Sequence, residues 1–276
     1  MRLEAIIPDF PANTTHGPIN FYDFAGDSWV VLFSHPADFT PVCTTELGRM
    51  AVHLPEFEKR NVKLLALSCD KLETHTDWVN LLGSELPHKI SAVDTPRARG
   101  KTPVVGGVNM LHKMIVDVML CRVRRINNAF YFSNKDIKSY CQDIPGEFPY
   151  PIISDESREL AVKLDMLNEA DRENPDTAMT VRALYVISPD KRLRLSMVYP
   201  TSTGRNVDEL LRVIDSLQLH DRLKVIATPA NWVPGDKVMI LPTVTDEQIQ
   251  ELFPEGAVDS VSMPSGKCYV RTTTKY

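Results

Sequence analysis

Two short apolar segments constrain the fold of this chain most strongly. Residues 29–33 read Trp-Val-Val-Leu-Phe, and residues 62–67 read Val-Lys-Leu-Leu-Ala-Leu. Nearly continuous apolar runs of this length are typical of strands that are buried on both faces. Between them lie a polar loop, residues 34–41, and a stretch of helical character, residues 44–59. We therefore predict a β–α–β unit with parallel strands and an α/β fold class.

Further elements are expected in the second half of the chain. The pattern predicts a helix over residues 156–166 and strands over residues 183–187 and 193–199. It also predicts an amphipathic helix over residues 207–217, because apolar residues recur there at helical spacing. Asn206 suits the N-cap of that helix.

Length and composition are those of an ordinary globular protein. The chain has 276 residues, of which 43% are hydrophobic and 24% charged, and this length allows one large domain or two smaller ones. Prolines and glycines break the chain into short pieces near its C-terminal end. We predict a main domain over residues 1–219 and a smaller domain over residues 220–276. The net charge of −5 gives no electrostatic reason to expect nucleic acid as a partner.

The N-terminal region and the cysteine count indicate the compartment. Glu4, Pro8 and Asp9 interrupt any apolar secretion signal. The longest apolar stretch, residues 114–120, contains Asp117 and is too short to span a bilayer. Five cysteines are too few for a disulfide framework, and their odd number leaves one thiol unpaired within the chain. We expect a cytoplasmic protein without a transmembrane segment.

Residues 81–134 differ from their surroundings. They contain eight Lys and Arg against three Asp and Glu, a net charge of +5, which leaves −10 for the rest of the chain. We interpret them as an atypical basic insertion that interrupts the main domain. A surface insertion is favoured over a basic arm for nucleic acid, since neither aromatic residues nor a basic amphipathic helix accompany the charges. A retained intron is a further interpretation.

The sequence Phe33-Ser-His-Pro-Ala-Asp-Phe-Thr-Pro-Val-Cys-Thr-Thr-Glu46 carries the clearest chemical signal. It leaves the end of a predicted strand and enters a helix, where open α/β sheets place their sites. Thr40 suits the N-cap and Pro41 the first helical position, so Cys43 falls in the first turn. Free backbone N–H groups and the helix dipole stabilise a thiolate there. The alternative is an inert, buried cysteine.

These residues resemble a known family. Pro36, Thr40 and Cys43 have the spacing of the peroxiredoxin active-site motif, and SHPADFTPVCTTELGR resembles the 1-Cys, peroxiredoxin 6 subfamily of the AhpC/TSA superfamily. Segments such as KRNVKLLALSCD, YPTSTGRNVDELLRVIDSLQL and ATPANWVPGDKVMILPT resemble it in the same order. The resemblance covers the chain except residues 81–134. It implies a thioredoxin-like three-layer fold with a smaller C-terminal domain.

The resemblance also implies an activity. Members are thiol-specific peroxidases without a metal or organic cofactor, whose cysteine, here Cys43, reduces hydrogen peroxide and organic hydroperoxides, phospholipid hydroperoxides included. Thr40 matches the hydroxyl that contacts peroxide, Pro36 the residue that shields the cysteine, and Arg182 the active-site arginine. Three positions match residues that support the pocket: His35, Glu46 and Arg205. A non-catalytic scaffold or holdase chaperone is the alternative.

The remaining cysteines predict how the cycle closes. A resolving cysteine in a Val-Cys-Pro setting is absent from the sequence, and Cys69, Cys121, Cys141 and Cys268 lie in other contexts. The resemblance therefore implies a 1-Cys cycle, in which an external thiol reduces the sulfenic acid of Cys43. In the subfamily this thiol is glutathione, delivered by a glutathione S-transferase. The subfamily also leads us to expect a homodimer.

A second activity of the subfamily, phospholipase A2, requires a serine, a histidine and an aspartate. Ser28 and Asp190 match the first and the last of these positions, but Tyr22 stands at the histidine position. A tyrosine cannot replace histidine as a general base at neutral pH, since its pKa lies near ~10. His16 is in a nearby loop, and nothing in the sequence places it correctly. We predict weak or absent lipase activity.

Overall fold

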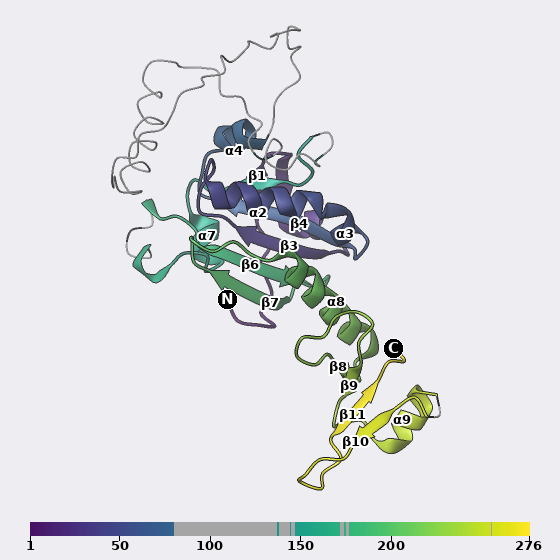
Figure 1. Cartoon of the computed structure of the whole chain (residues 1–276). Helices are drawn as coiled ribbons and strands as arrows, with labels where there is room; N and C mark the ends of the chain where they lie inside the picture. Colours follow the sequence, from purple (N-terminus) through teal and green to yellow (C-terminus); the bar gives the residue numbers. More distant parts are fainter. Residues whose placement is uncertain (80–136, 138–143, 145–146, 172–173, 175–176, 255) are drawn as a thin grey trace, which may run out of the picture. The chain divides into compact units, whose positions relative to one another are not determined.

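The computed structural model describes most of the chain outside the predicted insertion (Figure 1). The described residues are 1–79, 137, 144, 147–171, 174, 177–254 and 256–276. The chain divides into two units, residues 1–80 with 135–276 and residues 81–134. The second unit, which carries the predicted basic insertion and Cys121, lies outside the described residues, and so does Cys141.

The larger sheet has seven strands in the order β2-β1-β5-β4-β3-β6-β7. Their bounds are β1 Pro11–Thr14, β2 Gly17–Asn20, β3 Trp29–Ser34, β4 Val62–Ser68, β5 Ile152–Ser154, β6 Arg182–Ile187 and β7 Leu193–Tyr199. Strands β3 and β4 pair in parallel, which confirms the predicted β–α–β unit. Strand β6 pairs antiparallel with both β3 and β7.

Helices cover both faces of this sheet. They are α1 Phe21–Ala25, α2 Pro41–Val52, α3 Leu54–Glu58, α4 Leu72–Val79, α7 Glu159–Lys163, the 3₁₀ helix η1 Glu169–Asp171 and α8 Val207–Leu223. Val31 and Phe33 of β3 pack in one core cluster with α2, α4 and α8, while Val30 and Leu32 pack in another with α1 and α7. Side chains of a strand alternate between its faces, so a buried central strand serves two cores. This arrangement confirms the three-layer fold.

Two predicted helices differ from the observed ones. The stretch 44–59 forms two helices, α2 and α3, because the chain breaks at His53 and Pro55 lies in the first turn of α3. The helix predicted over 156–166 is only the short α7. Arg158 before it and Asp165 after it have φ values of 63° and 60°, and this left-handed backbone bounds the helix on both sides.

A smaller sheet follows α8. Asn206 caps α8 as predicted, since its side chain accepts hydrogen bonds from the N–H groups of Asp208 and Glu209. The helix continues to Leu223, past the predicted domain boundary after residue 219. Beyond it, β8 Ile226–Ala227, β9 Val238–Ile240, β10 Asp259–Val261 and β11 Val270–Thr273 form a sheet in the order β10-β11-β9-β8, accompanied by α9 Asp246–Leu252.

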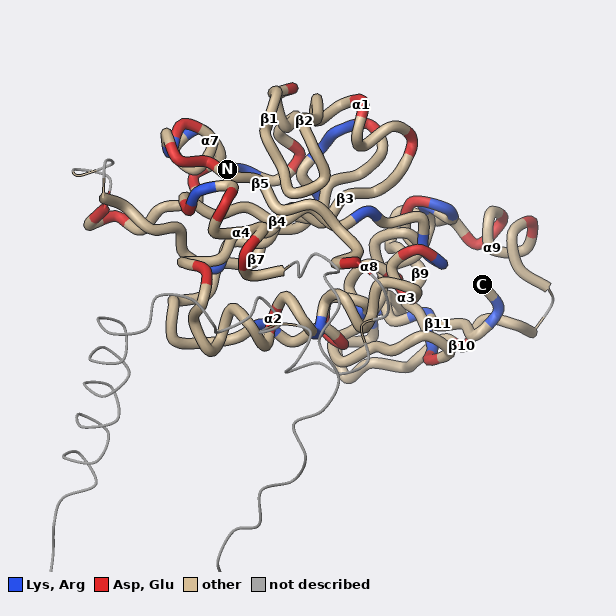
Figure 2. The backbone as a smooth tube through the Cα atoms, turned by 90° about the horizontal axis from the view of Figure 1, so that it is seen from above, with Lys and Arg blue, Asp and Glu red and all other residues tan. Residues whose placement is uncertain are grey.

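Acidic and basic residues are intermixed along the described chain in Figure 2. Within the described ranges, none of the helices has the length and apolar character needed to cross a membrane.

Candidate active site

The N-terminus of α2 places Cys43 where the sequence predicts it. Thr40 occupies the N-cap, Pro41 begins the helix, and Cys43 lies in the first turn with its side chain completely buried. The Thr40 side chain, however, does not cap the helix. Its hydroxyl donates instead to the carbonyl oxygen of Ala37 at 2.9 Å, which closes the preceding turn.

Arg182, the first residue of β6, brings a positive charge to Cys43. Its Nη1 lies 3.4 Å from Sγ of Cys43 and 2.5 Å from a carboxylate oxygen of Glu46. The opposite edge of the guanidinium donates to the carbonyl oxygen of Thr201, from Nε at 3.0 Å and from Nη2 at 2.6 Å. The fork of the arginine therefore serves three acceptors at once, and this fixes its direction.

Glu46, one helical turn beyond Cys43 on α2, and Arg205, in the loop before α8, complete the charged cluster. The carboxylate of Glu46 accepts hydrogen bonds from the backbone N–H of Arg205 at 2.7 Å and from its Nε at 2.8 Å. Burial alone would raise the pKa of Glu46, but the Arg205 guanidinium, and then Arg182, hold this pKa below its ordinary value. Two guanidinium groups thus face one carboxylate, and the cluster becomes neutral when Cys43 is a thiolate.

Gly204 lies against the first turns of α2. A Cβ atom at this position would lie 3.4 Å from Val42 and 3.8 Å from Glu46, which is ordinary van der Waals contact. The loop that carries Arg205 therefore packs directly on α2, next to Cys43.

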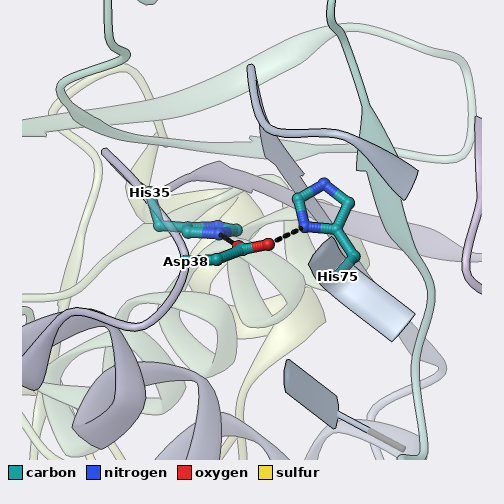
Figure 3. Close-up of side chains that lie close together, drawn as sticks. All are labelled: His35, Asp38 and His75. Atoms are coloured by element: carbon teal, nitrogen blue, oxygen red, sulfur yellow. Dashed lines mark hydrogen bonds and ion pairs between the residues drawn. The ribbon is translucent and has the colours of Figure 1, made fainter. Parts of the chain in front are cut away.

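A second buried polar cluster lies on the approach to Cys43. Asp38 stands between the rings of His35 and His75, as Figure 3 shows. One oxygen of its carboxylate lies 3.0 Å from Nε2 of His35, and the other lies 2.6 Å from Nδ1 of His75. All three side chains are buried. Burial lowers the pKa of His35, even though Asp38 acts in the opposite direction.

This trio has the residue types of a metal site, so we tested its geometry. One possible ligand atom from each of His35, Asp38 and His75 lies within 4.8 Å of the others. Ligands around tetrahedral zinc, with bonds of about 2.0–2.1 Å, lie about 3.3 Å apart. The two Asp38 contacts are shorter than this, and each uses a separate oxygen. The arrangement fits a hydrogen-bonded network better than an ion site.

The loop from His35 to Thr40 is held on several sides. The hydroxyl of Thr180 donates to the carbonyl oxygen of His35, and the backbone N–H of Asp38 donates to the carboxylate of Asp70 at 2.8 Å. Phe39 has a φ of 54°, an uncommon value for an aromatic residue, and it stays 48% exposed. Pro36 is buried within this loop.

The residues that match the lipase positions have other partners. The Tyr22 hydroxyl donates to the carbonyl oxygen of Ile7. The Ser28 hydroxyl donates to Asn61, and the Asp190 carboxylate accepts from Ser188. These contacts give Ser28 no basic partner, and weak or absent lipase activity stays a prediction. His16 contacts the carbonyl oxygen of Phe148.

Comparison with known proteins identifies the family. A model of the AhpC/TSA family matches residues 3–92, and a model of the C-terminal domain of 1-Cys peroxiredoxin matches residues 216–255. Peroxiredoxin-6 of Gallus gallus is 44% identical over 267 residues, which cover 96% of this chain and 94% of that protein. The chain belongs to the peroxiredoxin 6 subfamily. It is a thiol-dependent peroxidase.

Solved peroxiredoxin structures share the fold. A crystal structure of the peroxiredoxin 6 of Arenicola marina matches with a TM-score of 0.74 and 40% identity, over 99% of this chain and 97% of that one. A structure of a yeast mitochondrial 1-Cys peroxiredoxin, studied for thiol resolution by glutathione and thioredoxin systems, matches with a TM-score of 0.69 and 35% identity over 99% of both chains.

The structure joins four of the seven predicted peroxidase residues through direct contacts, while Thr40, Pro36 and His35 lie in the preceding segment with other partners, and it adds residues that the sequence did not single out. Cys43, Glu46, Arg182 and Arg205 form one contact network. Asp38, Asp70 and His75 were missed. One signal pointed to Asp70: it follows β4, the parallel neighbour of β3, and the carboxyl ends of parallel strands meet at one edge of the sheet.

Proposed function

We propose that Cys43 is the peroxidatic nucleophile of this peroxidase. Its thiolate attacks the distal oxygen of a hydroperoxide, so that an S–O bond forms and the O–O bond breaks. The products are the sulfenic acid of Cys43 and an alkoxide or hydroxide, which takes up a proton and leaves as alcohol or water. The contact between the buried Sγ of Cys43 and Nη1 of Arg182, at 3.4 Å, carries this proposal.

The residues around Cys43 would have different roles in this reaction. Arg182 stabilises the thiolate and the charge that develops on the peroxide oxygens, because its guanidinium is fixed before the reaction begins. The Thr40 hydroxyl contacts the bound peroxide, and Pro36 shields the cysteine from water. Glu46 and Arg205 hold Arg182 in place through their shared carboxylate contacts.

The substrates we propose are hydrogen peroxide and organic hydroperoxides, phospholipid hydroperoxides included. Two large apolar side chains beside the site support the organic substrates. Phe39 in the loop before α2 is 48% exposed, and Met179, next to the Thr180 that binds the His35 carbonyl, is 52% exposed. Exposed apolar side chains in such positions suit contact with an alkyl chain.

An external thiol would return Cys43 to the reduced form. The other cysteines of the described chain are unsuited to this role. Burial, and then Asp155, raise the pKa of Cys69 to about 12, and Cys268 lies in the C-terminal part without the Val-Cys-Pro setting of a resolving cysteine. We propose glutathione as the reductant, delivered by a glutathione S-transferase in the cytoplasm. Over-oxidation of Cys43 to sulfinic acid is the expected route of inactivation.

We further propose a homodimer that forms through β7. This strand is the last in the order of the large sheet. Residues 4–5 make two backbone hydrogen bonds with its first residue, Leu193, and Glu4 forms an ion pair with Arg194. Val198 near the other end of the strand is 60% exposed. An open edge with an exposed apolar side chain is a template for pairing with a second copy.

Peroxide consumption with dithiothreitol as reductant tests the proposed nucleophile. The wild-type chain and Cys69→Ser should consume hydrogen peroxide at the same rate, whereas Cys43→Ser should lose the activity. Full activity of Cys43→Ser would overturn the proposal. Absence of peroxide consumption by the wild-type chain would favour the non-catalytic scaffold or holdase.

A further inference from the structure

The His35, Asp38 and His75 network fixes which nitrogen of His35 carries a proton. Burial alone would raise the pKa of Asp38, but the hydrogen bonds with His35 and His75 hold this pKa below its ordinary value. An ionised carboxylate can only accept hydrogen bonds. Nε2 of His35, 3.0 Å from this carboxylate, must therefore be the protonated nitrogen. Because the ring is buried and neutral, its Nδ1 keeps a free lone pair.

Nδ1 of His35 is an acceptor without a donor. Within the described residues it is one of three buried side-chain nitrogens that have no hydrogen-bond partner. A buried polar atom of this kind is costly unless a ligand or a water molecule satisfies it. His35 also begins the loop that leads into α2 and Cys43, and its carbonyl oxygen accepts a hydrogen bond from Thr180, two residues before Arg182.

His75 and Asp70 hold Asp38 independently of His35. Nδ1 of His75 lies 2.6 Å from one carboxylate oxygen, while Nε2 of the same ring lies 3.2 Å from the carbonyl oxygen of Ile153. The backbone N–H of Asp38 donates to Asp70. One oxygen of Asp38 is thus occupied by His75, and the other remains aimed at His35 (Figure 3).

We propose that Asp38 and His75 are positioning residues for the peroxidase reaction: they hold His35 in the tautomer whose Nδ1 accepts a hydrogen bond from the O–H of the bound hydroperoxide. This inference rests on the proposed role of Cys43. Arg182 supplies only donors, and a hydroperoxide carries one hydrogen on its distal oxygen. A donor on one side and an acceptor on the other would orient the O–O bond for attack.

Asp38→Asn is the direct test. The amide has the shape of the carboxylate, but one of its two groups donates, so it cannot accept from both rings. The rate constant for oxidation of Cys43 by hydrogen peroxide, measured by stopped-flow fluorescence in a single turnover, should fall roughly 10- to 100-fold. Asp23→Asn, an exposed aspartate in α1, is the matched control and should keep the wild-type rate.

Two variants of His75 separate the hydrogen bond from packing. An asparagine places its amide N–H close to the position of Nδ1, so His75→Asn should keep most of the wild-type oxidation rate. His75→Leu fills the space without a donor and should be as slow as Asp38→Asn. Equal loss in both His75 variants would overturn the proposal.

A double-mutant cycle asks whether Asp38 acts through His35. In a His35→Leu background, Asp38→Asn should cause no further loss of rate, because the group it positions is already gone. Losses that add would overturn the proposal. They would leave the role of Cys43 untouched, since that role is tested separately by Cys43→Ser.

The tautomer can also be read in the wild-type protein, without any variant that has to fold. Nitrogen-15 NMR distinguishes protonated from unprotonated ring nitrogens by their chemical shifts. We expect Nε2 of His35 to be protonated and Nδ1 to be bare in the reduced protein. A proton on Nδ1 would contradict the proposal.

Discussion

At the scale of single residues, the reactivity of Cys43 depends on how Arg182 distributes its hydrogen bonds. The guanidinium contacts the sulfur, the Glu46 carboxylate and the Thr201 carbonyl at the same time. None of these partners alone would fix the direction of so long a side chain. Together they hold a positive charge against Sγ before the peroxide arrives, so no reorganisation is needed during the reaction.

Arg182→Lys should therefore slow the oxidation of Cys43 strongly. Lysine keeps the charge but offers a single, flexible ammonium that cannot serve three acceptors in this geometry. We expect the second-order rate constant with hydrogen peroxide to fall roughly 100-fold in stopped-flow experiments. Arg194 of β7, which forms an ion pair with Asp221 of α8, provides the control: Arg194→Lys should react like the wild type. A wild-type rate in Arg182→Lys would contradict the account.

Cys69 and Cys268 should differ sharply in alkylation. At pH 8 a thiol with a pKa of about 12, as for Cys69, is almost entirely protonated and therefore a poor nucleophile. Cys268 is exposed. Mass spectrometry after treatment with iodoacetamide should show Cys268 modified and Cys69 intact. Labelling of Cys69 as fast as that of Cys268 would show that the Cys69 thiol is not suppressed by burial.

The sequence alone indicates some of these residues and not others, for a physical reason. Thr40 and Cys43 occupy the motif spacing of one helix start, and Arg182 and Glu46 match single positions of the family. The partnership of Asp38 with His75 spans 37 residues and depends on how α4 packs on the sheet. A local pattern carries no information about such a contact. The direction of the Thr40 hydroxyl, toward Ala37, is likewise decided by the turn and not by residue preference.

At the scale of elements, the predictions succeeded where hydrophobic periodicity is strong and failed at helix ends. Strands β3, β4, β6 and β7 lie where the apolar runs place them. The division of residues 44–59 into α2 and α3 depends on a proline and on local dihedral angles, and the short length of α7 depends on left-handed residues at both of its ends. Such features are weak in a single sequence because they depend on the neighbouring packing.

The free edge of β7 leads to a prediction about assembly. A lysine at position 198 would place a charge on the edge that we propose as the dimer contact, and natural proteins use such charges to prevent strand pairing. Val198→Lys should shift the protein from dimer to monomer in analytical ultracentrifugation. Val162→Lys changes a valine of similar exposure, 56% against 60%, on α7 and should leave the dimer intact. A dimeric Val198→Lys would place the interface elsewhere.

At the scale of the whole molecule, Glu46 links the active site to the stability of the fold. Its carboxylate connects α2 with the start of β6 and with the loop before α8 through buried contacts to two arginines. The pKa of Glu46 is lowered in the folded protein, so the unfolded chain takes up a proton at this position first as the pH falls. This contribution to stability is complete above about pH 4.5 and is lost as the pH falls through the folded pKa.

Glu46→Gln should remove that part of the acid sensitivity. We expect the variant to be less stable than the wild type at pH 7, because two buried arginines lose their counter-charge. We also expect the unfolding free energy of the variant to fall less steeply than that of the wild type as the pH drops below about 4.5, because glutamine binds no proton in this range. Urea unfolding over this pH range measures both effects. Parallel pH dependences in the two proteins would contradict the assignment.

The central claim, that Cys43 is the residue oxidised by the substrate, can be tested most directly by chemical trapping. One equivalent of hydrogen peroxide is added to the reduced protein in the presence of dimedone, which captures sulfenic acids, and the labelled peptide is identified by mass spectrometry. We predict one label in the wild type, on the peptide that contains Cys43. The variant Cys43→Ser, which keeps Arg182 and the fold, should carry no label on that peptide. Peroxide consumption with the label on Cys69 or Cys268 instead would contradict the account.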